Sequence, residues 1–464
     1  MTPRLRWPAL GLTLLLAAGA CNSGSASPSA AAPSNPPAAT VAPSSAAPVP
    51  SVASTASTAP SASAAASQEQ GVDDGTKLTM WTRAATEARV TALVTAYNGT
   101  HKNQIQLRVV PTDDYQTVVG AAAPNSQLPD LFSADVVFMP NWTSQGLFTD
   151  LTDRINGLSY ISSVSQAHIV ASTWDNKKYG LPFIIDLSVW MYNKALFTKA
   201  GLDPEKAPTT LKEFAADALA IRQKVGGDVY GTLFGGQCGG CNVFTWWPTS
   251  WAEGQPIMNP AGTESLLNSA TMKELYSTYA DLWAKDAIFP NSNQEAGPTW
   301  TASFPKGLIG IQPMPASLQS LATADLKDSD IGVTAIGGLT KGTSTFVGGD
   351  SIGVSKDSKH VDAAWNFLSW MLGDYAQVEV VAKGGNVVAR SDLAANKYSS
   401  ADPRLVLFNT IAGKGETPFA LKFGQTFNDP QAPWVKLLRA AVFDKADSAT
   451  IDTLNKDITT SLQP

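Results

Sequence analysis

The apolar residues beyond about residue 71 recur at two alternating spacings, and this pattern limits the possible folds more than any other feature of the chain. They alternate in 77-KLTMWT-82 and again in 105-IQLRVV-110, as in half-buried β-strands. Between these segments, 90-VTALVTAY-97 carries apolar residues at helical spacing. Thr210 and Glu213 form a capping box that predicts the start of another helix. The repeated change from strand to helix predicts an α/β fold.

The body of the chain, residues 71–464, is longer than one hydrophobic core normally supports, so we expect two lobes. The full chain has 33 basic and 39 acidic residues and a net charge of −6. Its sequence contains no basic cluster, and nucleic-acid binding depends on neutralising phosphates with such residues. We therefore expect no nucleic-acid partner.

The amino terminus has the pattern of a secretion signal. Two arginines precede the apolar run 10-LGLTLLLAAGA-20, which is too short for a stable membrane span. Cys21 follows directly, in a pattern that resembles a bacterial lipobox, where the thiol is lipidated and the peptide is cut before it. The lipobox usually has Leu where Ala18 stands, so a plain cleaved signal peptide is the alternative. In either case residues 1–20 are a signal peptide and the protein is exported.

A biased segment separates this signal from the body. Residues 21–70 consist almost wholly of Ser, Ala, Pro and Thr after the cysteine. A segment with so few apolar side chains cannot bury a core, so we predict a disordered tether. Such a tether would hold the folded body clear of a membrane surface.

Seven segments along residues 77–464 resemble one family in their order and residues. They are 78-LTMW-81, 129-PDLF-132, 146-GLFTDLTD-153, 180-GLPFIIDLSVWMYNKALFTKAGLD-203, 306-KGLIGIQ-312, 348-GGDSIGVSK-356 and 433-PWVKLLRAAV-442. This ordered set is similar to the extracellular solute-binding proteins of ABC importers, in the carbohydrate-binding group that includes maltose-binding protein. The fourth segment is the most specific.

The resemblance implies a two-lobe periplasmic-binding-protein fold of class II topology, with the ligand in a cleft between α/β lobes. The N-terminal lobe is expected to contain residues 71–185 and 351–395. The C-terminal lobe is expected to contain residues 186–350 and 396–464. A ligand that touches both lobes binds the closed form better than the open form, so it shifts the population toward closure.

The resemblance also implies a function, the capture of a sugar or oligosaccharide for an ABC permease with a separate ATPase subunit. We expect a monomer without a cofactor or metal, attached to the membrane only through lipid on Cys21. Its location would be the outer face of the bacterial cell membrane, or the periplasm of a cell with two membranes. The alternatives are a secreted glycoside-acting enzyme with a carboxylate pair, and an adhesion or sensing lipoprotein on the same scaffold.

A sugar needs flat apolar surfaces for its C–H faces and charged acceptors for its hydroxyl groups. Asp186 lies where maltose-binding protein has an acidic ligand residue, and Asp135 lies where relatives contact sugar. Trp81 and Arg83 end the first strand, where α/β sheets present ligand-binding loops. We predict that all four bind the ligand. The alternatives are a hinge carboxylate for Asp186, a loop cap for Asp135 and a core position for Trp81.

The segment that begins at Asn242 is the predicted contribution of the second lobe, since relatives return aromatic and amide side chains to the cleft here. It contains Trp246, Trp247 and Trp251. We expect Pro248 to interrupt any helix in this segment, so that the three tryptophans cannot share one buried stripe. At least one is therefore expected to face the ligand, with a purely core role as the alternative.

Two further candidates lie in later segments. Asp350 follows two glycines, which allow the backbone to approach a ligand closely. Met314 stands near the position where family members often have a tryptophan. This departure leaves the identity of the sugar open.

Cys238 and Cys241 have C-x-x-C spacing. A zinc site would need two more ligands, but the three histidines are far apart in sequence and lack ligand-like spacing. A redox motif would place the cysteines at the opening of a helix, whereas 235-GGQCGGCN-242 indicates a glycine-rich loop. We therefore predict a disulfide that shapes this loop. Its reduction is expected to weaken binding more than it lowers the melting temperature.

An enzyme is not predicted. The segment 349-GDSIG-353 matches the G-x-S-x-G pattern, but that motif requires a turn into a helix after the serine. Here Ser351 is followed by the alternating residues of a strand. The pair Asp135 and Asp186 is the remaining candidate for catalysis, and the sequence does not fix their separation.

Overall fold

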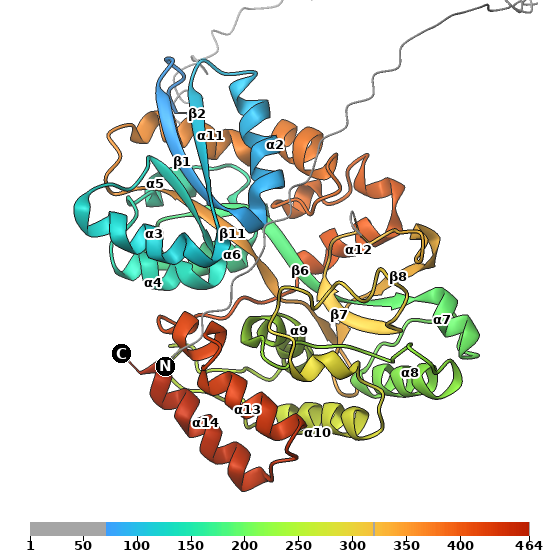
Figure 1. Cartoon of the computed structure of the whole chain (residues 1–464). Coiled ribbons are helices and arrows are strands. Elements are labelled where there is room, and N and C mark those ends of the chain that lie inside the picture. The colour runs from blue at the N-terminus through green and yellow to red at the C-terminus, as the bar shows by residue number, and fades with distance from the viewer. Residues whose placement is uncertain (1–70, 319–320, 464) are drawn as a thin grey trace, which may run out of the picture. The chain divides into compact units, whose positions relative to one another are not determined.

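The computed structural model describes residues 71–318 and 321–463 (Figure 1). The predicted signal peptide, Cys21 and the tether lie outside these residues. Strands and helices alternate along the described chain, which confirms the α/β prediction. None of the helices in this part of the chain has both the length and the apolar character that a membrane crossing requires.

The elements have the following bounds. The strands are β1 (Lys77–Arg83), β2 (Gln104–Val110), β3 (Leu131–Asp135), β4 (Thr173–Trp174), β5 (Lys177–Lys178), β6 (Leu181–Asn193), β7 (Ile311–Pro315), β8 (Ile331–Thr334), β9 (Ile336–Gly337), β10 (Thr343–Ser344) and β11 (Val347–Val354). The α-helices are α2 (Glu87–Asn98), α3 (Tyr115–Ala122), α4 (Met139–Ser144), α5 (Thr152–Asn156), α6 (Gln166–Ala171), α7 (Lys194–Lys199), α8 (Leu211–Lys224), α9 (Gly239–Ala252), α10 (Ala270–Ala284), α11 (Val361–Met371), α12 (Pro403–Ala412), α13 (Pro433–Val442) and α14 (Ser448–Leu462). The short helices are η1 (Ala84–Thr86), η2 (Thr112–Asp114), η3 (Ala123–Asn125), η4 (Val136–Phe138), η5 (Ile161–Ser163), η6 (Pro290–Asn293), η7 (Asp328–Asp330), η8 (Ala376–Ala382), η9 (Ser391–Leu393), η10 (Ser399–Ala401) and η11 (Gly424–Asn428).

One seven-stranded sheet organises these elements, in the order β2-β1-β3-β11-β6-β7, with β8 also paired to β6. Strand β1 is parallel to β2 and β3, whereas β11 is antiparallel to both β3 and β6. Arg83 and Asp135 are the last residues of β1 and β3, so they reach the same edge of the sheet. The antiparallel register of β11 places Asp350 opposite Asp135. The sheet thus brings residues distant in sequence to one place.

Strand β6 connects two sets of partners. Up to Leu187 it pairs with β11, and from Ser188 onward it pairs with β7 and then also with β8. All of its residues are buried except Asp186, which is partly exposed. Asp186 therefore lies one residue before the point where the strand changes partners.

The buried apolar side chains form two large cores and a smaller one. One large core includes Leu78 of β1, Leu93 of α2 and Trp365 of α11. The other includes Phe214 of α8 and Trp434 of α13, and it draws on α9, α10 and α14 as well. Figure 1 shows α13 beside α10 and α14, and all three helices contribute side chains to this second core.

The predicted start of helix α8 is confirmed. Thr210 is the N-cap, and its side chain accepts a hydrogen bond of 3.2 Å from the Glu213 N–H. The Glu213 carboxylate completes the cap by accepting from the Thr209 N–H at 2.8 Å, one residue earlier than a standard capping box places it.

Helix α9 corrects two of our expectations about residues 235–252. The helix continues through Pro248, although proline has no N–H to donate to the carbonyl of Phe244. The helix also begins at Gly239, directly after its N-cap Cys238, so the cysteines open a helix. Most residues of α9 are buried, and tertiary packing of this kind outweighs a weak local preference.

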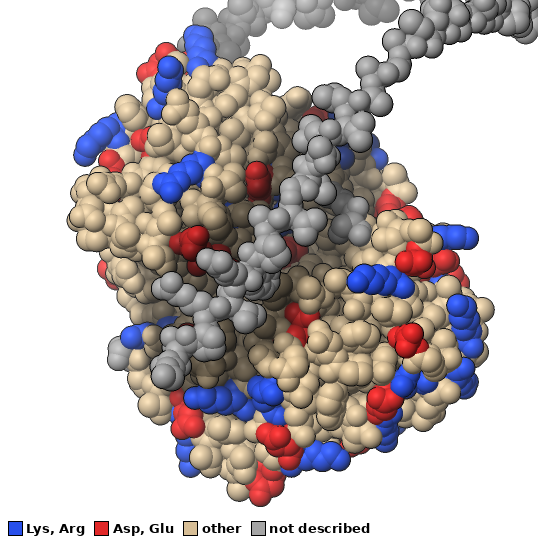
Figure 2. Space-filling model, viewed as in Figure 1, with Lys and Arg blue, Asp and Glu red and all other residues tan. Residues whose placement is uncertain are grey.

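Charges of both signs mix on the face shown in Figure 2, where Lys and Arg side chains lie among Asp and Glu. This face carries no extended basic patch of the kind that nucleic acids require.

Candidate functional site

A cleft of about 260 Å³ lies at the edge where β1, β3 and β6 present their polar residues. Its lining residues are Arg83, Asp135, Val137, Asp186, Gly240, Cys241, Val243, Phe244, Trp300, Pro315, Phe346, Gly348, Gly349, Phe423 and Asn428. We call Arg83, Asp135 and Asp186, with Asp350 behind them, the polar lining. We call Phe244, Trp300, Phe346 and Phe423 the aromatic lining.

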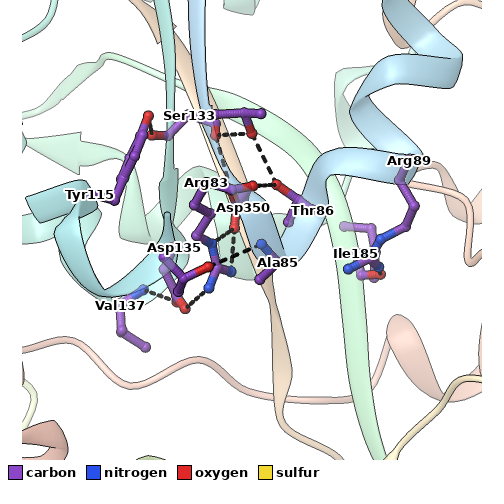
Figure 3. Close-up of polar contacts among 12 residues, drawn as sticks. Arg83, Ala85, Thr86, Arg89, Tyr115, Ser133, Asp135, Val137, Ile185 and Asp350 are labelled. Atoms are coloured by element: carbon purple, nitrogen blue, oxygen red, sulfur yellow. Dashed lines mark hydrogen bonds and ion pairs between the residues drawn. The ribbon is translucent and has the colours of Figure 1, made fainter. Parts of the chain in front are cut away.

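Arg83 is held between two carboxylates (Figure 3). Its Nε donates to Asp350 Oδ1 at 2.8 Å, and its Nη2 also contacts that oxygen. Its Nη1 lies 3.1 Å from Asp135 Oδ2. Asp350 has an exposed fraction of 0%, against 17% for Arg83 and 27% for Asp135. Ser133 donates a further hydrogen bond of 3.0 Å to Asp350 Oδ2, so this buried carboxylate is paired on both oxygens.

The protonation of the polar lining follows from burial and charge. Burial raises the pKa of Asp135, and the Arg83 charge opposes this shift. Burial also raises the pKa of Asp186, against the charges of Arg89 and Arg83. Burial disfavours the charged form of Arg83, but Asp350 and Asp135 outweigh it and raise the pKa of the guanidinium, which stays ionised.

Of the two carboxylates that line the cleft, Asp186 makes fewer polar contacts with the rest of the protein. Its Oδ1 accepts a hydrogen bond of 3.1 Å from the Leu187 N–H, the single hydrogen bond that the side chain makes within the described residues. By contrast, Asp135 accepts from the Val137 N–H at 3.3 Å and is also paired with Arg83. Asp186 therefore has the greater capacity to accept hydrogen bonds from a ligand.

The glycines beside Asp350 let β11 and β6 approach closely. Gly349 has φ 100°. A Cβ atom at this position would lie 1.9 Å from the Ile184 carbonyl oxygen, so only glycine fits. The register of β11 on β6 shifts just after this point, between Asp350 and Ser351. Gly348 and Gly349 consequently line the cleft with bare backbone.

The aromatic lining comes from four separate segments. Phe244 lies on α9 and contacts Phe346, with ring centroids 5.3 Å apart. Phe423 directly precedes η11. Trp300 lies in the connection between η6 and β7, where Gln312 Nε2 donates to its carbonyl oxygen at 2.5 Å. These rings give the cleft apolar surface next to its charged groups.

Of the ten predicted ligand residues, three line the cleft, namely Arg83, Asp135 and Asp186. Asp350 lies behind them as the buried partner of Arg83. Trp81 is half-buried against a core, with the Arg108 guanidinium 4.9 Å from its ring centroid, and it is not part of the lining.

The remaining predicted residues are buried outside the cleft lining. Met314 is in the core, while its neighbour Pro315 lines the cleft. Asn242 donates hydrogen bonds to the carbonyls of Gly235 and Cys238, at 2.5 Å and 2.9 Å, so it braces the preceding loop.

The three tryptophans of α9 lie in a core, and the expectation that one of them faces the ligand is not met in this structure. Trp246 stacks on Tyr279 of α10, with ring centroids 4.4 Å apart. Trp247 meets Phe427 of η11 edge-on at 4.9 Å. Trp251 is also buried. The reason is that α9 has partners on several sides, so its tryptophans need no single buried stripe.

The aromatic lining is what the sequence reasoning missed. Phe244 stands inside the tryptophan-rich segment that we examined, one helical turn before Trp247. Trp300 stands in 296-AGPTWTAS-303, a polar loop in which a large aromatic has no neighbouring apolar stripe. That isolation is a usable signal, because such a residue is either satellite core or ligand surface.

The predicted disulfide between Cys238 and Cys241 is confirmed, with the two Cα atoms 5.3 Å apart. The sulfur of Cys238 also accepts a hydrogen bond of 3.2 Å from the Cys241 N–H, which caps α9. Cys241 lines the cleft. In residues 71–318 and 321–463, no group of three or more His, Cys, Asp or Glu is placed to hold a metal ion.

A cleft with charged acceptors and aromatic surface, set at the strand edge of a mixed α/β fold, defines a binding protein for small polar molecules. The sequence matches the family of bacterial extracellular solute-binding proteins over residues 92–406. The chain belongs to this family, whose members are binding proteins and not enzymes.

Two curated relatives share part of this sequence. The chain is 25% identical over 338 residues to the diacetylchitobiose binding protein DasA of Streptomyces coelicolor, covering 71% of this chain and 76% of the relative. It is 26% identical over 283 residues to a putative binding protein of Brucella abortus, covering 61% of this chain and 67% of the relative.

Solved structures share the fold. The sugar-binding protein MalE of Xanthomonas citri superposes with a TM-score of 0.72 at 16% identity, over 83% of this chain and 97% of that one. The GacH receptor of Streptomyces glaucescens gives a TM-score of 0.71 at 20% identity, over 84% and 98%. The predicted periplasmic-binding-protein fold is confirmed by these matches.

Proposed function

We propose that this protein captures a neutral sugar or oligosaccharide in the cleft and delivers it to the permease of an ABC importer. The observation that carries the proposal is the charge arrangement of the polar lining. Arg83 is neutralised by Asp350 and Asp135, and Asp186 adds a further acceptor. An anionic solute would be repelled by these carboxylates, whereas hydroxyl groups would donate charge-assisted hydrogen bonds to them.

The aromatic lining supports the same ligand class. Rings such as Phe244 and Trp300 offer flat apolar faces to the C–H surfaces of a sugar, and they lose little conformational entropy on binding. The similarity to a diacetylchitobiose binding protein and to a sugar-binding protein agrees with this class.

Ligand capture would operate by lobe closure. The proposed lobes comprise residues 71–185 with 351–395, and residues 186–350 with 396–464. The change of partners in β6 after Leu187 supports a hinge at the first boundary. A ligand bound by both linings would then favour the closed form, and the permease would recognise closure as occupancy.

The membrane anchor is proposed from the sequence alone. Lipidated Cys21 would attach the exported protein to the outer face of the cell membrane, through residues 21–70 as a tether. Replacement of Cys21 by Ala should release the protein from the membrane fraction into the medium or periplasm. Retention of the variant in the membrane fraction would contradict the anchor.

The function is tested by thermal melts of the exported protein with diacetylchitobiose, maltose and maltotetraose. A true ligand at a concentration 100-fold above its dissociation constant adds about 2.7 kcal/mol to stability, which a melt detects readily. Chromatography of the same mixture shows whether the sugar is intact. A saturable shift with intact sugar supports a receptor, a cleaved sugar would make it an enzyme, and no shift would favour the adhesion or sensing alternative.

Two matched variants place the ligand. Asp186→Asn removes the charge from the cleft carboxylate that makes the fewest polar contacts within the protein. The rise in melting temperature that the sugar causes should therefore be much smaller in this variant. Asp217→Asn is the control, because Asp217 is a partly buried aspartate of α8 outside the cleft lining, with its pKa raised to about 6 by burial. Equal effects of the two variants would place the ligand elsewhere.

A further inference from the structure

The chain segment that carries Trp300 is tied to the loop that carries the disulfide. We call residues 292–300 the tryptophan segment and residues 235–241 the cysteine loop. The Gly236 N–H donates to the Ser292 carbonyl at 2.7 Å, and the Gln237 N–H donates to the Glu295 carbonyl at 2.9 Å. These backbone bonds fix the first half of the tryptophan segment along the cysteine loop.

The disulfide faces the second half of this segment. A Cβ atom on Gly297 would lie 3.1 Å from Cys238 Sγ and 3.7 Å from Cys241 Sγ. Gly297 has φ 122°, a backbone conformation that L side chains rarely adopt. The side of Gly297 on which a side chain would stand therefore faces the two sulfur atoms, three residues before Trp300.

A buried carboxylate fixes the turn between the disulfide and Trp300. Glu295 has an exposed fraction of 4%. Its Oε1 accepts from the Gly297 N–H at 2.8 Å and from the Thr299 N–H at 3.3 Å. Its Oε2 accepts from the Thr299 hydroxyl at 2.5 Å. The backbone from Glu295 to Thr299 is thus held in one shape, and Trp300 follows it directly.

We propose that Trp300 is the stacking surface for a sugar ring in the cleft, and that the Cys238–Cys241 disulfide positions it through Gly297. This inference rests on the proposed function of the cleft. Trp300 is partly buried against a core, and the residue also lines the cleft. A disulfide closing so short a loop adds little stability through chain entropy, so its effect is local shape.

The positioning half of the proposal is tested without ligand, by hydrogen exchange on the exported protein. The variant Cys238→Ser/Cys241→Ser removes the sulfur bridge, and serine at position 238 remains a good N-cap for α9. The Gly297 and Thr299 amides should exchange at least tenfold faster in the variant, while the amides of α10 keep their rates. Unchanged exchange at both amides would overturn the positioning role.

Two glycine-to-alanine variants distinguish the effect of contact with the disulfide from the effect of backbone strain. Gly297→Ala places a methyl group against the sulfur atoms, whereas Gly75→Ala also introduces alanine at positive φ, 97°, but with open space around the new Cβ. Only Gly297→Ala should accelerate exchange at Thr299. The same result for both variants would show that strain alone is responsible.

The ligand half is tested by calorimetric titration with diacetylchitobiose and maltotetraose. Trp300→Ala should weaken binding of the sugar that binds wild type by at least tenfold. Trp283→Ala, at a partly buried tryptophan of α10 outside the cleft lining, should leave affinity within twofold. Equal affinities of the two variants would overturn the role of Trp300.

A double-mutant cycle links the two halves. The double cysteine variant should weaken binding in the wild-type background but have little further effect when Trp300 is already alanine. Additive losses would show that the disulfide acts on another part of the cleft and overturn the proposal. If neither sugar binds the wild-type protein, the proposed sugar function fails, while the exchange experiment still decides whether the disulfide positions Trp300.

Discussion

The polar lining and the aromatic lining of the cleft are positioned by different means. Arg83 and Asp135 end adjacent parallel strands, and Asp350 faces Asp135 across an antiparallel pair. Their places are set by sheet register, which changes only in whole residues. Phe244 and Trp300 instead depend on a proline-containing helix and on a loop held by a disulfide. One cleft can therefore combine hydrogen-bond acceptors positioned by the sheet with aromatic rings positioned by local contacts.

The core tryptophans of α9 give the largest test of this comparison. Trp247→Ala should destabilise the protein by about 3–5 kcal/mol, because it removes a fully buried indole and leaves a cavity. Sugar affinity should change little in the fraction that is folded, since Trp247 does not line the cleft. Denaturant unfolding and titration of the same sample measure both quantities. Full stability with lost affinity would return Trp247 to the ligand surface.

The polar lining should respond to loss of its buried charge. Asp350→Ala leaves Arg83 without its main partner, at a cost of about 3–5 kcal/mol in the free energy of unfolding. Asp135→Ala should cost less, because Asp135 is 27% exposed and water can replace it. Guanidinium unfolding of both variants gives the order directly. A smaller loss of stability for Asp350→Ala than for Asp135→Ala would contradict the role of Asp350 as the main buried partner of Arg83.

Two kinds of signal in the sequence predicted much of the polar lining, namely strand patterns and the resemblance to known solute-binding proteins. Alternating residues identified β1, and the ends of parallel strands meet at one sheet edge. This reasoning predicted Arg83, whereas Asp135 and Asp186 were predicted from the resemblance to maltose-binding protein and its relatives; all three line the cleft. Asp350 was found as well, although its role is to hold Arg83 and not to line the cleft.

The aromatic lining was not predictable by the same reasoning. The local preference of proline predicts that a helix ends near Pro248. Helix α9 instead continues, because it is packed on several sides. The segment that carries Trp300 is hydrogen-bonded to Gly236 and Gln237, which come much earlier in the chain. Contacts between loops have no periodicity, so the sequence gives no register for them.

His168 should make the stability of the protein depend on pH. It lies on α6 and is fully buried, with Nδ1 3.0 Å from Ser165 Oγ. Burial lowers its pKa from 6.5 to about 4, although the charge of Asp350 opposes the shift. The unfolded chain thus takes up a proton below pH 6.5 that the folded protein refuses until about pH 4.

Stability should therefore fall as the pH drops from 6.5 to 4, by about 3 kcal/mol from this histidine. His168→Gln cannot take up the proton, so the slope of unfolding free energy against pH should flatten in this window. His101→Gln is the control, because His101 is partly exposed on another part of the protein. Identical slopes for wild type and His168→Gln would show that this histidine does not set the acid limit.

The smallest effect that we expect is a pH dependence at Asp186, which should have opposite signs for stability and for sugar affinity. Burial raises its pKa above 3.8 in the folded protein. Its contribution to stability is therefore present below pH 3.8 and is lost as the pH rises through the raised pKa. Sugar affinity should have the opposite sign, because the ionised carboxylate is the better acceptor. Affinity should thus rise a few-fold with pH across the same window.

Titrations of a neutral sugar at pH 4.5, 5.5 and 7 in wild type and Asp186→Asn isolate this contribution. The amide does not ionise, so the variant should bind more weakly at pH 7 and lose the part of the slope that Asp186 supplies. Asp217→Asn removes a carboxylate of α8 whose pKa is about 6, and it should leave the slope of affinity unchanged, since Asp217 does not line the cleft. If the Asp217 variant flattens the slope and the Asp186 variant does not, the pH dependence arises from folding. Asp186 would then not be an acceptor for the ligand, and binding would depend on the aromatic lining.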